Sequence, residues 1–251
     1  MKLLIATSNT GKFSEFRELL RLPHVALVSL NDIPGLDPFQ ESGITFAENA
    51  REKAAHFHGL TGMPVVADDS GLEVELLGGA PGIHSARYAG AAASDHDRIE
   101  KLLQEIKQVS RESGALRSEA KAKRREPGSS ATSTRLDKVR PLTAEEKFKQ
   151  MESFEIGSVD VPKVPGYDVL SPARFVCALS YYDNGEEQFF CESECRGFIV
   201  SRPQGTGGFG YDPVFLVPEA EKTMAELTRA EKNELSHRGK AVRKLREFLA
   251  R

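Results

Sequence analysis

The chain has 251 residues, 28% of them charged, and a formal net charge of −3 at pH 7. This length allows one large domain or two small ones with a substantial core, and the nearly balanced charge argues against nucleic-acid binding by the protein as a whole. No apolar run approaches the ~20 residues that span a bilayer, and the N-terminus lacks the apolar stretch of a signal peptide, so we expect no membrane contact.

The first predicted elements are a strand and a helix joined by a polar turn. Residues 3–7 form an apolar run typical of a buried strand, and Phe13, Phe16 and Leu20 share one face of the helix that follows. Backbone N–H groups at a helix N-terminus, together with a lysine, form a natural phosphate site. A polar helix cap with a surface lysine explains the same residues. The segment in question is Thr7-Ser8-Asn9-Thr10-Gly11-Lys12.

A second helix precedes the most informative stretch of the chain. Residues 45–48 form a capping box, which predicts a helix that ends near Gly59 or Gly62. A short buried strand at 64–67 then delivers Asp68 and Asp69 at its end, where α/β proteins bind ligands. Side chains alternate along a strand, so we expect the two carboxylates on opposite faces, one of them free to hold a metal ion. A solvated turn is the alternative interpretation.

The middle of the chain changes character twice. Residues 77–90 are rich in Gly and Pro and predict an irregular segment, after which Ser94 starts a third helix with an apolar stripe. From about residue 111 the chain is basic and poor in large apolar side chains, which predicts a flexible insertion at about 111–165. A short helix at 143–151 is expected within it. The insertion is either inert or contacts a partner or nucleic acid weakly.

Strand signals return at residue 175. Residues 175–182 predict a strand, and Asp183-Asn184-Gly185 predicts a type I′ hairpin turn into return strands at 188–191 and 197–200. The three cysteines of the chain are too few and too scattered for a disulfide framework or a zinc site. We therefore interpret them as structural thiols in a cytoplasmic protein.

A glycine-rich loop and a cationic group lie near the C-terminus. Residues 205–210 match G-x-G-x-x-G but precede a strand instead of a helix, which excludes a dinucleotide-binding fingerprint. The loop presents Phe209 and Tyr211, one of which could stack on a flat ring while Asp212 accepts hydrogen bonds from it. A hairpin with buried aromatic side chains is the alternative.

Three potential cations lie at the start of a final amphipathic helix that begins at about His237. A helix N-terminus disfavours positive charge, so Lys232, His237 and Arg238 suggest that an anion binds among them, although a solvated surface would also explain them. Together with Glu41 and the paired aspartates, these groups suit hydrolysis of a nucleoside triphosphate.

Six segments, in this order, closely resemble the inosine triphosphatase (Ham1-like) family of noncanonical purine nucleotide pyrophosphatases. They are residues 6–12, 45–50, 67–72, 78–88, 205–213 and 236–238. The resemblance covers about 1–108 and 172–251. It implies an α/β fold: an elongated, two-lobed mixed β-sheet with flanking helices and a central substrate cleft. Residues 1–251 would form one catalytic domain that the insertion at about 111–165 interrupts.

The resemblance also implies the reaction and its residues. A homodimeric, Mg²⁺-dependent hydrolase would cleave dITP, ITP, XTP and dXTP to the monophosphate and pyrophosphate, removing them from the nucleotide pool. Asp69 matches the family's catalytic base and metal ligand, and Glu41 matches a second metal ligand. The matching substrate contacts are Thr7, Ser8, Asn9, Thr10, Gly11, Lys12, Ser70, Phe209, Gly210, Tyr211, Asp212, Lys232, His237 and Arg238.

Two departures and two alternatives accompany the resemblance. Many relatives have Glu-Glu-Thr-Gly where this chain has Gln40-Glu41-Ser42-Gly43, which leaves the identity of the second metal ligand open. Relatives also have a short connection in place of the insertion. A Maf-like pyrophosphatase for modified pyrimidine nucleotides and a non-catalytic nucleotide-binding protein are the alternative functions.

Overall fold

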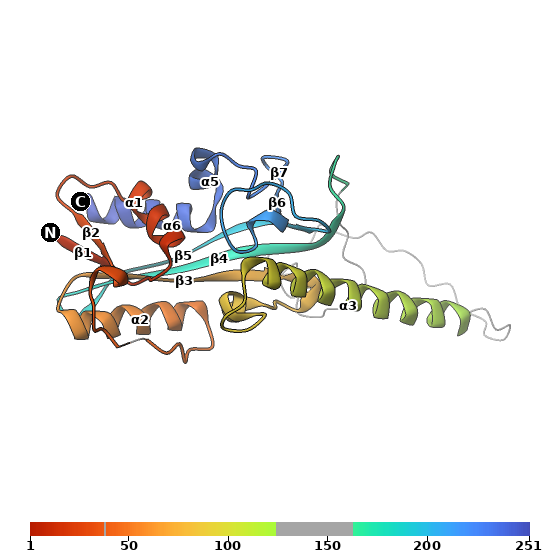
Figure 1. Ribbon diagram of the computed structural model, residues 1–251, viewed down its shortest axis with the longest axis horizontal. Coiled ribbons are helices and arrows are strands. Elements are labelled where there is room, and N and C mark those ends of the chain that lie inside the picture. Colours follow the sequence, from red (N-terminus) through yellow and green to blue (C-terminus); the bar gives the residue numbers. More distant parts are fainter. Residues whose placement is uncertain (38, 124–162) are drawn as a thin grey trace, which may run out of the picture.

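The computed structural model describes residues 1–37, 39–123 and 163–251, with backbone alone for 113–123 (Figure 1). Its strands are β1 (Lys2–Ile5), β2 (Ala26–Ser29), β3 (Val65–Val74), β4 (Val169–Asp183), β5 (Glu186–Val200), β6 (Phe215–Val217) and β7 (Lys222–Thr223). Its α-helices are α1 (Thr10–Leu19), α2 (Phe46–Thr61), α3 (Asp95–Lys123), α5 (Arg229–Leu235) and α6 (His237–Leu249). None of the described helices is long and apolar enough to cross a membrane.

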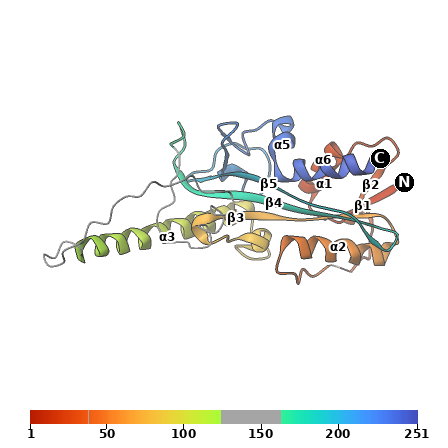
Figure 2. The same ribbon diagram turned by 180° about the vertical axis from the view of Figure 1, so that it is seen from behind.

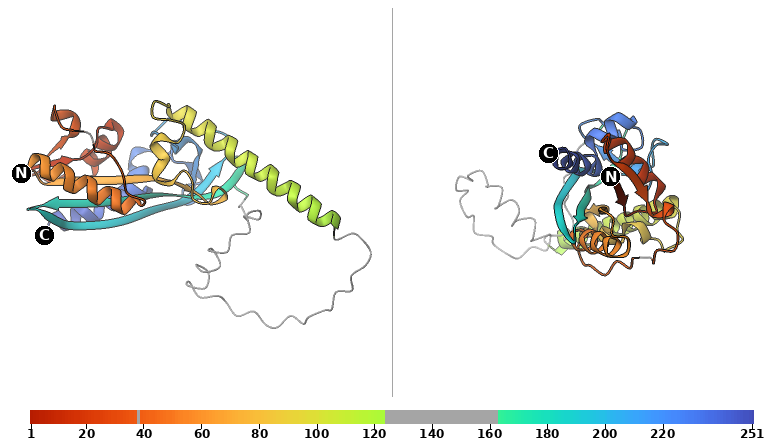
Figure 3. Two further views of the ribbon diagram at one scale, coloured as in Figure 1. Left: turned by 90° about the horizontal axis from the view of Figure 1, so that it is seen from below. Right: turned by 90° about the vertical axis from the view of Figure 1, so that its left-hand side faces the viewer.

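One mixed sheet organises the molecule. Its seven strands follow the order β2-β1-β3-β4-β5-β6-β7, with β1 parallel to β2 and β3 and all later pairs antiparallel. The helices α1, α5 and α6 lie on one side of the sheet and α2 and α3 on the other (Figures 1 and 2). The long β4–β5 hairpin gives the molecule its elongated shape, which Figure 3 shows from below and from one end. The expected elongated α/β fold with flanking helices is confirmed.

The core divides along the length of the sheet. At one end, Phe16 of α1 and Leu245 of α6 pack on Val66, while Ala54 and Phe57 of α2 pack against the opposite face. At the other end, the apolar stripe of α3 packs against Leu72, Phe175 and Phe215. These two groups of packed side chains are the expected lobes. The stripe consists of Ile99, Leu102, Leu103 and Ile106, all buried.

The strand that carries the two aspartates is longer than expected. The sequence predicts a strand that ends at residue 67, but β3 continues to Val74 because every residue from Val65 onward pairs with β4. Asp68 and Asp69 therefore lie in the middle of a strand. Gly71 is required there, because a Cβ at this position would lie 2.5 Å from the Gly82 carbonyl oxygen and 2.5 Å from Ser85 Oγ. This close approach holds the segment 82–87 against the strand.

The β4–β5 hairpin confirms one prediction and corrects two. Asn184 and Gly185 have φ values of 53° and 84°, as a type I′ turn requires. The strand before the turn begins at Val169 instead of residue 175, with a register irregularity between Val169 and Ser171 just ahead of Pro172. The two expected return strands form one continuous strand, β5, because β4 supplies partners along its whole length.

The helical boundaries also differ in part. The third helix extends to Lys123, past the expected start of the insertion at 111, since its Ala, Glu, Lys and Arg residues are strong helix formers. Residues 124–162, with the helix expected at 143–151, lie outside the described residues. Lys232 belongs to a separate helix, α5, which follows a capping box between Thr228 and Glu231 and ends at Leu235, with Ser236 as its C-cap.

Candidate active site

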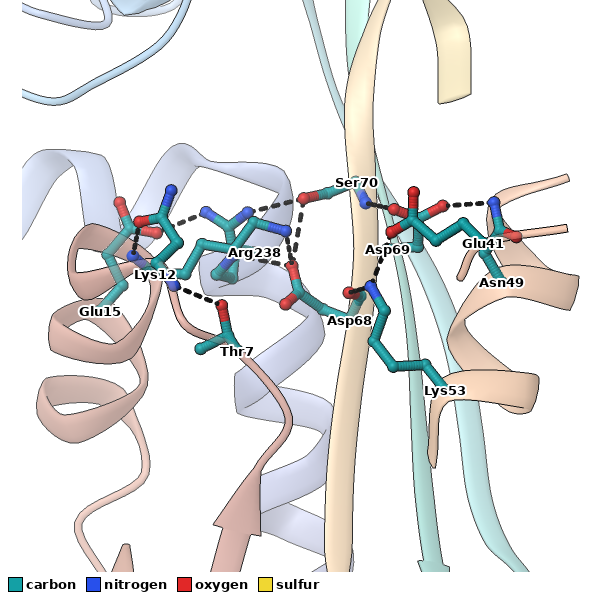
Figure 4. A network of polar contacts seen from close by, with 11 residues as sticks. Thr7, Lys12, Glu15, Glu41, Asn49, Lys53, Asp68, Asp69, Ser70 and Arg238 are labelled. Carbon is teal, nitrogen blue, oxygen red and sulfur yellow. Dashed lines mark hydrogen bonds and ion pairs between the residues drawn. The ribbon is translucent and has the colours of Figure 1, made fainter. Parts of the chain in front are cut away.

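The centre of the site is the middle of β3, where alternation sends the two aspartates to opposite faces, as predicted. Asp68 points toward α1 and α6 and accepts hydrogen bonds from Lys12 Nζ at 3.0 Å and Arg238 Nε at 3.2 Å. Asp69 points toward α2, where Asn49 Nδ2 donates to its Oδ2 at 3.0 Å. Figure 4 shows the two groups of contacts on either side of the strand.

Asp68 is the partner of two cations that helix caps bring to it. Asn9 caps α1 by accepting from Lys12 N at 3.0 Å, and Ser236 caps α6 by accepting from Gly239 N at 3.0 Å, which places Lys12 and Arg238 in first helical turns. Burial opposes ionisation of the Asp68 carboxyl, but the charges of Lys12 and Arg238 outweigh it and hold its pKa well below the usual range. Asp68 is therefore a permanent anion.

Arg238 is fully surrounded by partners. Its Nη1 lies 2.6 Å from Glu15 Oε2 and its Nη2 donates to Ser70 Oγ at 2.7 Å. Burial disfavours the guanidinium charge, but Asp68 and Glu15 outweigh burial and raise its pKa. Only 3% of Arg238 is exposed, so its guanidinium interacts with groups of the protein and of the adjoining cavity and hardly with bulk water.

Asp69 has the opposite electrostatic character. Burial raises the pKa of its carboxyl, and the nearby Glu41 carboxylate adds to the rise, against the opposing charges of Lys53 and Lys12. Asn49 and the backbone N–H of Ser70 each hold one of its oxygens. A carboxylate with a raised pKa and a fixed orientation is suited to accept a proton.

Glu41 reaches the site from the loop before α2 and is held by two cations. Lys53 Nζ lies 3.0 Å from Glu41 Oε1 and 3.3 Å from the Asp68 carbonyl oxygen, and Arg87 Nη1 lies 2.8 Å from Glu41 Oε2. Burial works against ionisation of Glu41, but these cations prevail and lower its pKa. Glu41 is thus anionic beside Asp69.

The Glu41 and Asp69 carboxylates are oxygen ligands of the kind that Mg²⁺ binds in proteins. Mg²⁺ in proteins keeps several waters and binds one or two carboxylates together with substrate phosphates. The Lys53 ammonium contacts a carboxylate oxygen of Glu41 and the carbonyl oxygen of Asp68, which shows that a cation is bound by oxygen atoms at this position. Within the described ranges there is no cluster of three or more His, Cys, Asp or Glu side chains that would form an all-protein metal cage.

A cavity of about 160 Å³ joins these groups to the glycine-rich loop. Twelve of the predicted site residues line it: Asn9, Lys12, Glu41, Asp69, Ser70, Phe209, Gly210, Tyr211, Asp212, Lys232, His237 and Arg238. Its volume is below the 300–1,000 Å³ range common for ligand sites. The remaining predicted residues are not among its lining residues: Thr7 and Ser8 precede Asn9, and Thr10 and Gly11 begin α1.

Phe209 is the aromatic side chain that the loop presents to the cavity. Lys232 Nζ lies 4.7 Å and Arg238 Cζ 5.7 Å from the centroid of its ring. A Cβ at Gly11 would lie 2.9 Å from Phe209 Cδ1, so the ring rests on the first turn of α1. Tyr211, the other candidate, is buried and donates its hydroxyl to the Ser85 carbonyl oxygen at 3.0 Å. Its ring is a structural element of the cavity wall.

Lys232 connects the loop to α1. Its Nζ lies 2.6 Å from Asp212 Oδ2 and 2.9 Å from Glu15 Oε1. Burial opposes the ammonium charge, but Asp212 and Glu15 raise the pKa of Lys232 overall. Asp212 Oδ2 also accepts a hydrogen bond from Phe209 N at 2.9 Å, so this one oxygen holds both the loop and the cation.

His237 is not the cation that the sequence suggests. Its ring is buried and stacks on Phe175, with ring centroids 4.9 Å apart and planes 14° from parallel. Burial lowers its pKa well below the usual range, and the charges of Arg238 and Lys232 lower it further. His237 lines the cavity, and its Nδ1 is buried without a hydrogen-bond partner in the described structure.

Several residues of the site escaped the sequence interpretation. Asn49 and Lys53 lie four residues apart on α2, a spacing that puts two polar side chains on one helical face next to buried alanines, and this pattern could have identified them. Glu15 and Arg87 gave no such signal, because an acid on a surface-like helix and an arginine in a glycine-rich segment are both ordinary.

Comparison with known proteins agrees with the resemblance. The Ham1 family model matches residues 3–131 and 166–248. The chain is 38% identical over 250 residues to the dITP/XTP pyrophosphatase of Pectobacterium atrosepticum and 37% identical to that of Escherichia coli strain K12, covering in each case 99% of this chain and 98% of the relative.

A solved HAM1 protein from Coxiella burnetii matches with a TM-score of 0.68 and 30% identity, covering 100% of this chain and 98% of that one. The Ham1 protein of Staphylococcus aureus matches with the same TM-score, identity and coverage. The agreement of motifs, fold and near-complete sequence matches leads to one conclusion. The chain belongs to the Ham1 family.

Proposed function

We propose that this protein is a nucleoside-triphosphate pyrophosphatase that hydrolyses dITP, ITP, XTP and dXTP to the monophosphate and pyrophosphate. Relatives with 37% and 38% identity carry the name dITP/XTP pyrophosphatase. The single observation that carries the chemistry is that the two faces of β3 present carboxylates with opposite pKa shifts. A carboxylate with a raised pKa, Asp69, lies on one face, and a permanent anion that organises two cations, Asp68, lies on the other.

The reaction uses the two ends of the cavity differently. We assign Asp69 as the base that orients a water molecule toward the α-phosphorus and takes up its proton, because its pKa is raised and its orientation is fixed by Asn49. Lys12 and Lys232 lie at the cavity to stabilise charge that develops on the phosphates. Glu41 and Asp69 would hold Mg²⁺, which when bound supplies positive charge to phosphate oxygens.

The other end of the cavity suits a purine. We infer that the base stacks on Phe209, since its ring borders the cavity. A 6-keto oxygen would accept hydrogen bonds from donors placed at this end of the cavity. The 6-amino group of adenine would leave them unpaired, a penalty that is large at a buried site.

A substrate panel tests this proposal. Purified protein with Mg²⁺ is expected to release pyrophosphate from dITP and XTP at least about 100-fold more efficiently than from ATP, since unpaired buried donors give discrimination of this order or larger. Chelation of the metal is expected to abolish release. The measurement is product analysis by ion-exchange chromatography. Equal turnover of ATP, or orthophosphate as the product, would contradict the proposal, and preference for UTP, CTP or methylated analogues would favour the Maf-like alternative.

We also propose that the protein is a single catalytic domain that forms a homodimer, in the cytoplasm. The continuous seven-stranded sheet supports one domain across residues 1–251, with 111–165 as an interruption. Membership of the family supports the dimer, and three free cysteines are typical of a reducing compartment. Light scattering is expected to give a mass near twice the 27.6 kDa of the chain, and a mass of one chain at micromolar concentration would refute the dimer.

A further inference from the structure

The Gly205–Gly210 loop separates two hollow regions of the protein. On its inner side lies the cavity already described, to which Phe209 and Gly210 contribute. On its outer side lies an open hollow of about 530 Å³ between the loop and the first turns of α3. The loop packs closely at Gly205, where a Cβ would lie 2.6 Å from the Ala225 carbonyl carbon, but a Cβ at Gly210 would meet no atom within 4 Å. Gly210 borders both hollows, so its position depends on its hydrogen bond.

Three backbone N–H groups of the loop are anchored by acceptors outside it. Gly207 N donates to the Ala225 carbonyl oxygen at 3.0 Å, and Phe209 N donates to Asp212 Oδ2 at 2.9 Å. Both acceptors follow shortly in the same segment of the chain. Gly210 N instead donates to Asp95 Oδ2 at 2.6 Å, across a sequence separation of 115 residues. Asp95 therefore ties the loop to the first turn of α3.

Asp95 is itself held in place. Its Oδ1 pairs with Arg98 Nη2, and Arg98 Nη1 donates to the carbonyl oxygens of Ala86 at 2.9 Å and Ala93 at 2.7 Å. Asp95 and Arg98 both line the inner cavity together with Phe209. The first turn of α3 is thus a wall of the site, although no motif of the sequence pointed to it.

We propose that Asp95 is a positioning residue that sets the place of Phe209 and thereby the affinity for the purine base. This inference rests on the proposed function. A short hydrogen bond to a carboxylate is stronger than one to a neutral acceptor, and Gly210, at φ 63°, adjoins Phe209 directly. Without Asp95, the Gly210 N–H loses its partner and the loop shifts into either hollow. The phosphate end, built on Lys12 and Asp69, keeps its contacts.

Three variants with a matched control test the proposal. Asp95→Ala removes the acceptor, Asp95→Glu displaces it and Asp95→Asn retains an acceptor oxygen. Glu100→Ala is the control, because Glu100 is an exposed acid on the same helix whose nearest ionic partner is His96 Nδ1 at 3.8 Å. Melting temperatures establish that each variant is folded.

Two ligands distinguish an effect on binding of the base from an effect on binding of the phosphates. Asp95→Ala removes a hydrogen bond to a charged group, so it is expected to raise the KM for dITP and the Kd for dIMP about 10-fold or more. The inhibition constant of inorganic tripolyphosphate, which has no base, is expected to stay within about two-fold of the wild-type value, as are all values for Glu100→Ala. Asp95→Asn is expected to recover most of the affinity, and Asp95→Glu to lie between.

The outcomes are distinct. Unchanged dIMP affinity in Asp95→Ala, or an equal loss of tripolyphosphate affinity, overturns the inference. If the alanine variant does not fold, wild-type dIMP affinity in Asp95→Glu overturns it instead. Calorimetry with dIMP needs no turnover, so the inference is judged separately from the proposed reaction, which fails on its own if the wild-type protein binds dIMP but does not hydrolyse dITP.

Discussion

Replacement of Asp69 by asparagine is expected to reduce turnover of dITP by a factor of about 10²–10⁴, the usual contribution of a general base, and to leave nucleotide binding within a few-fold of the wild-type value. The amide keeps the size of the side chain and an acceptor for Asn49 but cannot take up a proton. Single-turnover kinetics and binding of dIMP measure the two effects independently. Retained turnover would show that the base is another group.

The pKa of Asp69 gives this prediction a second readout. Because burial and Glu41 raise that pKa, the basic form exists only above it, and the acid limb of the wild-type pH profile of kcat/KM is expected above the ordinary aspartate value of about 3.9. A raised carboxyl pKa in the folded state also means that ionised Asp69 costs folding free energy above that pKa, a cost absent below the unfolded pKa. Asp69→Asn is therefore expected to be at least as stable as the wild type at pH 7.

Replacement of Asp68 by alanine is expected to cost about 3–5 kcal/mol of folding free energy, because it leaves buried cations without their shared anion. Arg238 is 3% exposed and Lys12 loses the carboxylate at 3.0 Å. Urea denaturation at pH 7 measures the cost. Glu234→Ala is the matched control, since Glu234 pairs with Arg243 at 3.2 Å but its side chain is 72% exposed, and such pairs contribute about 0–1 kcal/mol.

The sign of the pH dependence distinguishes Asp68 from Asp69. The pKa of Asp68 is lowered in the folded state, because Lys12 and Arg238 outweigh the effect of burial. Its stabilisation is therefore fully present above the unfolded pKa of about 3.9 and is lost as the pH falls toward the folded value. The difference in stability between the wild type and Asp68→Ala is expected to shrink in acid. A cost below about 1 kcal/mol at pH 7 would contradict the role of Asp68, because exposed pairs give as much.

Local patterns predicted the parts of the molecule that local forces determine. Alternation along a strand separated Asp68 from Asp69, and the preference of Asn-Gly for positive φ identified the hairpin turn. Thr45 caps α2 as expected, by accepting from Glu48 N at 3.1 Å. In each case the deciding interaction lies within a few residues.

The missed features depend on distant partners. β3 runs on through two aspartates and a glycine, residues that strands usually avoid, because a complete β4 strand pairs with them. The pKa of His237 is lowered first by burial and then by the charges of Arg238 and Lys232, and the ring of Phe175 that stacks on it is distant in the sequence. The contact of Asp95 with Gly210 joins residues that only the fold brings together.

The central position of the aspartates in β3 makes the alignment of strands part of the chemistry. A slip of one residue between β3 and β4 would exchange the faces of Asp68 and Asp69, placing the proposed base among the cations and their anion against α2. Ten consecutive residue pairs, from Val65–Tyr182 to Val74–Ala173, stand against such a slip. An error in strand alignment during folding would thus produce a protein that has every side chain of the site but has Asp68 and Asp69 on the wrong faces of the strand.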